Sequence, residues 1–142
     1  MSEDASYEAQ IAIVGALKND AALTALIGGR VYDHVPRDPT TKRVTADFPY
    51  VSLGAEQEVP ETYECIDGAE IIQQIDVWSR DPGFREVKRI AKAVKEALVN
   101  TPLSLSDNAL VYLAYDGRRV FRDPDGLTSH AALTFRIGVE NR

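Results

Sequence analysis

The sequence predicts an α+β fold in which two main helices pack on one face of a mostly antiparallel sheet. Three observations carry this prediction. Residues 71–80 alternate apolar and polar side chains, as in a strand with one buried face. Residues 84–100 change to the spacing of three and four that is typical of an amphipathic helix. Residues 130–140 alternate more clearly than any other stretch of the chain.

The central strand and the helix after it form one unit, joined by a tight turn. Ile71, Ile75 and Val77 fall on one side of an extended chain, with polar side chains on the other. Asp81 is expected to cap the helix, and Pro82 suits its first position. The apolar stripe of the helix comprises Phe84, Val87, Ile90, Ala91, Val94, Ala97 and Leu98.

The first thirty-five residues predict two helices and a short strand. The residues before Ser6 offer several capping side chains, and a helical stripe follows from 6 to 18. Asp20 restarts a short helix, which Gly28-Gly29 are suited to end. Residues 30–35 form a candidate edge strand that stops before Pro36, which has no backbone donor.

Two long polar segments flank the next strand, at 48–54. Residues 37–47 contain prolines, threonines and charges without an apolar period, which predicts an exposed loop. Residues 55–67 contain five acidic side chains and predict a projecting loop or an irregular hairpin. Connections of this length in a small domain are often functional.

The C-terminal part of the chain predicts two further strands. The first spans 109–121 and is interrupted at Asp116-Gly117 by a bulge or turn. Residues 122–126 form a turn, and the apolar side chains of the last strand, Leu133 and Phe135 among them, then face the core. If the passage from 71 to 121 places two parallel strands side by side, the sheet is mixed.

Composition limits the possible functions. A chain of 142 residues fits one domain, 1–142, that buries roughly two thirds of its unfolded surface. Its one cysteine, Cys65, has no internal disulfide partner, and no cysteine or histidine cluster suggests a metal or a cofactor. No apolar run reaches the ~20 residues needed to span a bilayer, so a soluble intracellular protein without membrane contact is expected. A net charge of −6 opposes unaided binding to nucleic acid.

Few residues suggest catalysis. Asp33 and His34 beside a hydroxyl such as Ser79 would be the elements of a small hydrolase, but adjacency in sequence is no evidence of triad geometry, and a surface histidine in a non-enzyme is favoured. No catalytic residue is therefore assigned. The acidic side chains of 56–64 lack the ligand spacing of a calcium loop, which favours a solvated loop.

Two features can be interpreted either as interaction surfaces or as ordinary parts of a folded monomer. Cationic side chains recur opposite the apolar stripe of the central helix, where they either contact an acidic partner or form a solvated helix face partly balanced by Glu86 and Glu96. Trp78, on the strand face of Ile72 and Asp76, either packs under a loop or contributes to an interface; burial within the monomer is favoured.

Three segments, in this order and spacing, carry a resemblance to a known family: 26–36 (LIGGRVYDHVP), 48–54 (FPYVSLG) and 75–80 (IDVWSR). The chain resembles the tail-completion proteins of tailed phages, which also occur in prophages and gene-transfer-agent particles. The likeness continues through the central helix and the last strand. The family has no catalytic motif, so the resemblance implies no enzyme activity.

The resemblance implies a structural virion protein, a tail terminator or head-to-tail joining subunit. Such a subunit forms a ring, commonly a hexamer, that caps the tail tube and meets the head connector or stopper protein, with DNA only as passing cargo. The resemblance also implies assembly in the bacterial cytoplasm and a final location in the virion tail. An acidic adaptor for one cellular protein and the small hydrolase are the alternatives. The candidate interface residues are Arg37, Lys42, Arg43, Glu56, Glu58, Glu61, Arg85, Lys88, Arg89 and Lys92.

Overall fold

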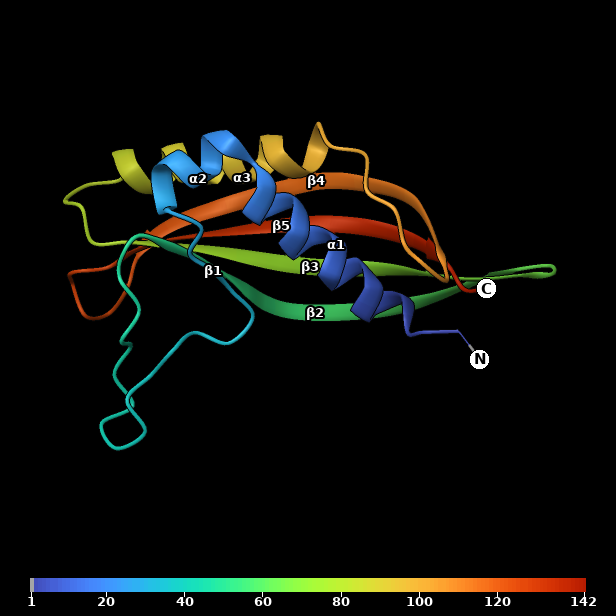
Figure 1. Cartoon of the computed structure of the whole chain (residues 1–142), viewed down its shortest axis with the longest axis horizontal. Coiled ribbons are helices and arrows are strands. Elements are labelled where there is room, and N and C mark those ends of the chain that lie inside the picture. Colours follow the sequence, from blue (N-terminus) through green and yellow to red (C-terminus); the bar gives the residue numbers. More distant parts are fainter. Residues whose placement is uncertain (1) are drawn as a thin grey trace.

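The computed structural model describes residues 2–142. Within this range, three helices lie on one face of a five-stranded sheet (Figure 1). This arrangement confirms the predicted α+β class. In chain order the elements are α1 (Ala5–Asn19), α2 (Ala21–Ile27), β1 (Val31–Tyr32), β2 (Tyr50–Tyr63), β3 (Ile66–Ser79), α3 (Arg85–Val99), β4 (Ala109–Arg122) and β5 (Ser129–Glu140).

The strands lie in the order β1-β2-β3-β5-β4. All neighbouring strands are antiparallel except β1 and β2, which pair in parallel through Val31 and Val51. The predicted possibility that β3 and β4 are parallel neighbours is wrong, because β5 lies between them. The passage through α3 therefore crosses over one strand. The sheet is mixed only because of β1, which is shorter than the strand predicted over 30–35.

Side-chain caps and a glycine define the first two helices. The Asp4 carboxylate accepts a hydrogen bond from the Tyr7 N–H at 3.1 Å, and the Asp20 carboxylate accepts one from the Leu23 N–H at 2.9 Å. Each bond satisfies a backbone donor that the first helical turn leaves free. Gly28 ends α2 with a φ of +62°, a left-handed conformation that costs glycine little.

The start of α3 differs from the prediction. The helix begins at Arg85, with Phe84 in the cap position and no side-chain cap, so the predicted cap at Asp81 is wrong. Gly83 lies between them with a φ of +77°. A right-handed helix requires negative φ, so Asp81 and Pro82 cannot belong to its first turn.

The segment 55–67 is more regular than predicted. It forms the ends of two long strands, and the ladder continues from the Glu56–Gln73 pair to the Tyr63–Ile66 pair. Backbone hydrogen bonds hold this ladder, and they do not require an apolar side-chain pattern. A register shift between Leu53 and Glu56 also breaks the alternation that identifies the start of β2.

The core lies between the helices and one face of the sheet. The apolar stripe of α3 packs there, together with Ile13 and Leu17 from α1. Leu133 and Phe135 are fully buried on β5, which confirms their predicted inward orientation. The predicted irregularity in β4 is confirmed as well, because the register shifts between Tyr115 and Gly117.

Candidate functional site

A cationic groove lies between α3 and the edge strand β4. Because the apolar stripe of α3 faces the sheet, its basic side chains lie outward along one side. The groove has a volume of about 540 Å³, and its floor includes Ala91 and Tyr115. Its cationic lining comprises Lys88, Arg89, Lys92, Lys95 and Arg118, and Arg85 extends the exposed strip toward the start of the helix.

These cations have few anionic partners within the chain. Among the residues that the structure describes, only Lys92 has a carboxylate within 4.0 Å, at 3.6 Å from Glu96. Lys95 Nζ instead lies 4.6 Å from the centroid of the Tyr115 ring, and Arg118 donates a long hydrogen bond to the Lys88 carbonyl. The groove thus presents a positive charge that the monomer leaves largely unneutralised.

The hairpin formed by the ends of β2 and β3, residues 55–67, has the opposite charge. It projects beyond the rest of the sheet, on the side where the termini lie (Figure 1). Its carboxylates are those of Glu56, Glu58, Glu61, Glu64 and Asp67, and the segment contains no lysine or arginine. Within residues 2–142, none of these carboxylates lies in an ion pair.

The hairpin also exposes apolar side chains. Tyr63 and Ile66 are paired across the ladder, so they share one face of the hairpin, and they are 65% and 50% exposed. Val59 lies on the same face by alternation and is 38% exposed. The tip of the hairpin therefore carries a small exposed apolar group in addition to its carboxylates.

The loop 33–49 holds a second group of predicted interface residues. Arg37, Lys42 and Arg43 are exposed there, and Arg37 donates a hydrogen bond to the Lys42 carbonyl at 3.0 Å. The N–H groups of Thr41 and Thr40 donate to the Asp38 carboxylate and lower its pKa. These bonds give a long loop a defined conformation.

The structure does not bring the three groups of predicted interface residues together. The loop 33–49 extends beyond the β1–β2 edge of the sheet at one end of the strands, and the hairpin projects from the other end (Figure 1). The cationic strip lies in the helical layer. The chain therefore presents three separate surfaces, and a neighbour that covers one of them leaves the others free.

The residues considered for a hydrolase are also separate. The Ser79 hydroxyl is fully buried and donates to the Glu86 carboxylate at 2.7 Å. The Asp33 carboxylate accepts a hydrogen bond from the Gln10 side chain at 3.0 Å. Among residues 2–142, no hydrogen bond joins His34 to either of them. This arrangement does not form a triad.

The other histidine, His130, occupies a buried site that sequence reasoning missed. Its Nε2 lies 2.6 Å from Asp76 Oδ1, and its Nδ1 lies 3.7 Å from a carboxylate oxygen of Asp123. Its ring stacks on Trp78 with centroids 3.8 Å apart. The predicted face of Trp78 is confirmed, but its partner comes from β5. Only the strand register, which pairs Trp78 with His130, could have identified this contact.

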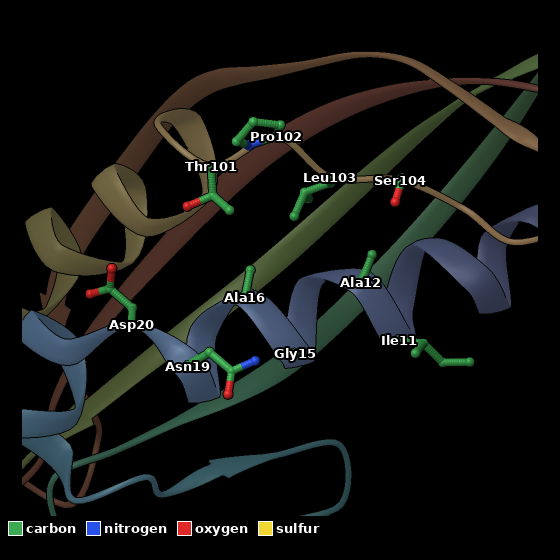
Figure 2. Close-up of a pocket in the computed structure, with 10 residues that line it drawn as sticks. All are labelled: Ile11, Ala12, Gly15, Ala16, Asn19, Asp20, Thr101, Pro102, Leu103 and Ser104. Atoms are coloured by element: carbon green, nitrogen blue, oxygen red, sulfur yellow. The ribbon is translucent and has the colours of Figure 1, made fainter.

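A second groove separates α1 from the segment that follows α3. Figure 2 shows Leu103 extending toward α1, where Ala12 and Ala16 line the opposite wall. The groove has a volume of about 350 Å³. The one carboxylate among its lining residues, Asp20, caps α2, so the groove offers packing surface and little chemistry.

The remaining candidate features are metal-binding clusters and membrane-spanning helices. Residues 2–142 contain no group of three or more histidine, cysteine, aspartate or glutamate side chains arranged to hold a metal ion. In the same part of the chain, no single helix has the length and apolar character of a membrane span. Helices α1 and α2 pass that test of length and composition as a pair, but the pair is bent by 76°.

Comparisons with known proteins identify the class. The family model described as tail completion protein gp17 matches residues 11–140. A chain in the virion of a native gene transfer agent particle superposes with a TM-score of 0.86 and 34% sequence identity, over 99% of this chain and 100% of that one. The gp17 protein of bacteriophage SPP1 superposes with a TM-score of 0.58 and 25% identity, over 94% and 89% of the two chains. No curated protein matches the sequence significantly.

These matches define a structural protein of phage-like tails. The chain belongs to the family of tail completion proteins related to gp17. The resemblance carried by the three sequence segments is therefore confirmed, and the matches support a location in the tail of a phage-like particle.

Proposed function

We propose that the protein is a ring-forming subunit, hexameric in the assembled tail, that caps the tail tube and joins it to the head connector or stopper protein. The match to a chain of an assembled particle carries this proposal, because it extends over 99% of the chain and so includes the hairpin and the loop. The structural role needs no catalytic residue, cofactor or metal.

A closed ring requires a heterologous contact, in which one surface of a subunit meets a different surface of the next copy. The separate exposed segments of this chain suit that requirement. A terminator also has two further neighbours, the tube below and the connector above, and each needs a surface of its own. The proposed contact residues are Arg37, Lys42, Arg43, Glu56, Glu58, Glu61, Arg85, Lys88, Arg89 and Lys92.

The overall charge suits a junction through which DNA passes. A net charge of −6 repels phosphate at long range, so DNA passes the junction as cargo without strong adhesion. The proposal therefore assigns protein surfaces, and no nucleic-acid site, to the exposed cations.

Light scattering of the purified protein, with and without assembled tail tubes, tests the proposal, and electron micrographs show whether rings form at tube ends. We expect rings in free solution or at tube ends, because a template can supply the contacts that close a ring. The proposal is wrong if the protein neither associates with itself nor binds tubes under both conditions.

A further inference from the structure

We propose that the acidic hairpin of one copy, residues 55–67, docks in the cationic groove between α3 and β4 of the next copy. This inference rests on the self-association proposed above and names the two surfaces that meet. It is a heterologous contact, since the hairpin and the groove are different parts of the chain.

The hairpin and the groove carry opposite charges. The hairpin holds five carboxylates and no basic residue, which accounts for most of the net charge of −6. The groove holds four α3 cations and Arg118, and among residues 2–142 only Lys92 of these has a carboxylate partner. Opposite charges on two surfaces of one chain attract copies of that chain and fix their relative orientation.

The hairpin and the groove lie in different parts of the subunit. Beyond the two residues paired with β1, β2 forms one edge of the sheet, and β4 forms the other edge. The hairpin tip projects past the end of the strands, whereas the groove lies farther along β4, where Tyr115 and Arg118 pair with Phe135 and Leu133 of β5. The two surfaces are therefore apart within one subunit, but they can meet between copies placed side by side. Repetition of that contact gives a ring where the rotation closes.

The dimensions of the two surfaces agree. The strand from Glu56 to Tyr63 is about 23 Å long at the usual rise of a β-strand. The groove cations from Lys88 to Lys95 extend over about 10 Å of helix. One arm of the hairpin is therefore long enough to pass along the cations and still place its tip beyond them.

Apolar side chains on both surfaces are available for the same contact. Tyr63 and Ile66 are 65% and 50% exposed in the monomer, and the groove floor contains the buried Ala91 and the ring of Tyr115. Contact between copies would remove the hairpin side chains from water. A nucleic-acid phosphate would also fit the groove, but it would leave the acidic and apolar hairpin without a partner.

The one cysteine of the chain allows a direct test, because Cys65 is exposed at the hairpin tip. Lys92→Cys adds a thiol in the groove, and Lys18→Cys, an exposed position on α1, is the matched control. A bifunctional maleimide is added to rings or tube-bound protein. We expect Lys92→Cys to give a ladder of products beyond the dimer, because each subunit then links to two neighbours, and Lys18→Cys to give none.

The possible results separate this inference from the proposed function. If rings form but Lys92→Cys gives no more product than Lys18→Cys, the hairpin contact is wrong and the ring remains. If Cys65 links mainly to the tube protein, the occupant of the groove is not a second copy and the inference is wrong. Absence of both rings and tube binding contradicts the proposed function, and this inference with it.

Charge reversal gives a second test that does not use cysteine. Lys88→Glu with Lys92→Glu, and separately Glu58→Lys with Glu64→Lys, should each weaken self-association about tenfold at low salt, the effect of losing two exposed ion pairs. The combined fourfold variant restores opposite charges across the contact, so association should recover. The proposal is overturned if every variant melts at the normal temperature and the fourfold variant still does not recover self-association.

Discussion

Ile75 and Asp76 are neighbours in β3, and both are buried, but they point to opposite faces of the sheet. Ile75 lies under the helices in a layer of aliphatic and aromatic side chains. Asp76 lies on the helix-free face, where His130 and the Gln74 amide contact its carboxylate at 2.6 and 2.8 Å. One face is thus buried by apolar packing, and the other by hydrogen bonds and stacked rings.

This difference affects how each face responds to mutation. An apolar layer loses stability in proportion to the volume removed, because the surrounding side chains fill a cavity only in part. A polar cluster responds to the loss of partners, because a buried group left without a hydrogen bond has lost its solvation as well. Substitutions on the two faces should therefore differ in size and in additivity.

The largest effect is expected on the covered face. Phe135 is fully buried, so Phe135→Ala should lower the free energy of unfolding by about 3–5 kcal/mol. Phe121→Ala is the matched control on the helix-free face, and it should cost less because Phe121 is only half-buried. Urea unfolding measures both variants. A loss below about 1 kcal/mol for Phe135→Ala would remove β5 from the core.

A smaller effect is expected for the polar cluster. His130→Ala removes a ring that stacks on Trp78 and contacts the Asp76 carboxylate, and it should cost about 1–3 kcal/mol. Asp76→Ala should cost a similar amount. The double variant should cost clearly less than the sum of the two, since both substitutions remove the same contact. Additive costs in urea unfolding would show that the contact does not hold this face together.

Much of the covered face could be predicted from the sequence, and little of the other face could. Phe135 and Leu133 face inward because a period of two places them there, and that pattern is visible in one strand alone. The contact of His130 with Asp76 joins residues 54 positions apart, so it depends on strand order and register. The regularity of the hairpin at 55–67, which the sequence predicts as a loop or an irregular hairpin, was also hidden, because most of its side chains face solvent and leave no apolar alternation.

The candidate surfaces also divide into those visible in one element and those that need the tertiary fold. The cationic strip on α3 could be predicted because it is the complement of an apolar stripe with helical spacing. The sequence did not identify Arg118 and Tyr115 as parts of the groove. Their position beside α3 depends on the place of β4 in the sheet, which the strand order determines. Local periodicity thus identifies a face of one element, whereas a groove between two elements requires the tertiary fold.

Glu8 is a buried charged residue in the helical layer, on the side of the sheet that is otherwise packed by apolar side chains. It is buried at the start of α1, where burial of its carboxylate opposes ionisation. Hydrogen bonds from the N–H groups of Asp107, Asn108 and Ser106, and from the Asn108 amide, outweigh that effect and lower its pKa. The carboxylate thereby ties α1 to the segment before β4.

The lowered pKa of Glu8 predicts a pH dependence. Because its pKa is lower in the folded chain than in the unfolded chain, ionised Glu8 stabilises the fold above its ordinary pKa, and this stabilisation is lost as the pH falls through the folded-state value. Glu8→Gln should lower the melting temperature at neutral pH and flatten its acid dependence, relative to the exposed control Glu58→Gln. Asp38 and Asp125 also have lowered pKa values, so part of the slope should remain. An unchanged slope would contradict this role.

The smallest effect on folding is expected on the outward side of α3. Lys88→Glu with Lys92→Glu touches neither face of the sheet, and each exposed substitution should change the free energy of unfolding by no more than about 0.5 kcal/mol. The main contribution comes from Lys92, which lies 3.6 Å from Glu96 one helical turn away and would become a like-charged neighbour. Thermal melting at low and high salt measures it, because salt screens exposed charges.

This variant separates the stability of the subunit from its assembly. The side chains of α3 that stabilise the fold are those that face the sheet, so its outward cations are free to contact a neighbour without a role in the core. We therefore expect normal melting together with fewer completed tails or tube-bound rings in electron micrographs, most clearly at low salt. Normal melting with normal ring counts would show that the cations are a solvated helix face, and would leave the hairpin and the loop 33–49 as the assembly surfaces. A large loss of melting temperature would instead mean that these charges belong to the fold, and the division between inner and outer sides of α3 would be wrong.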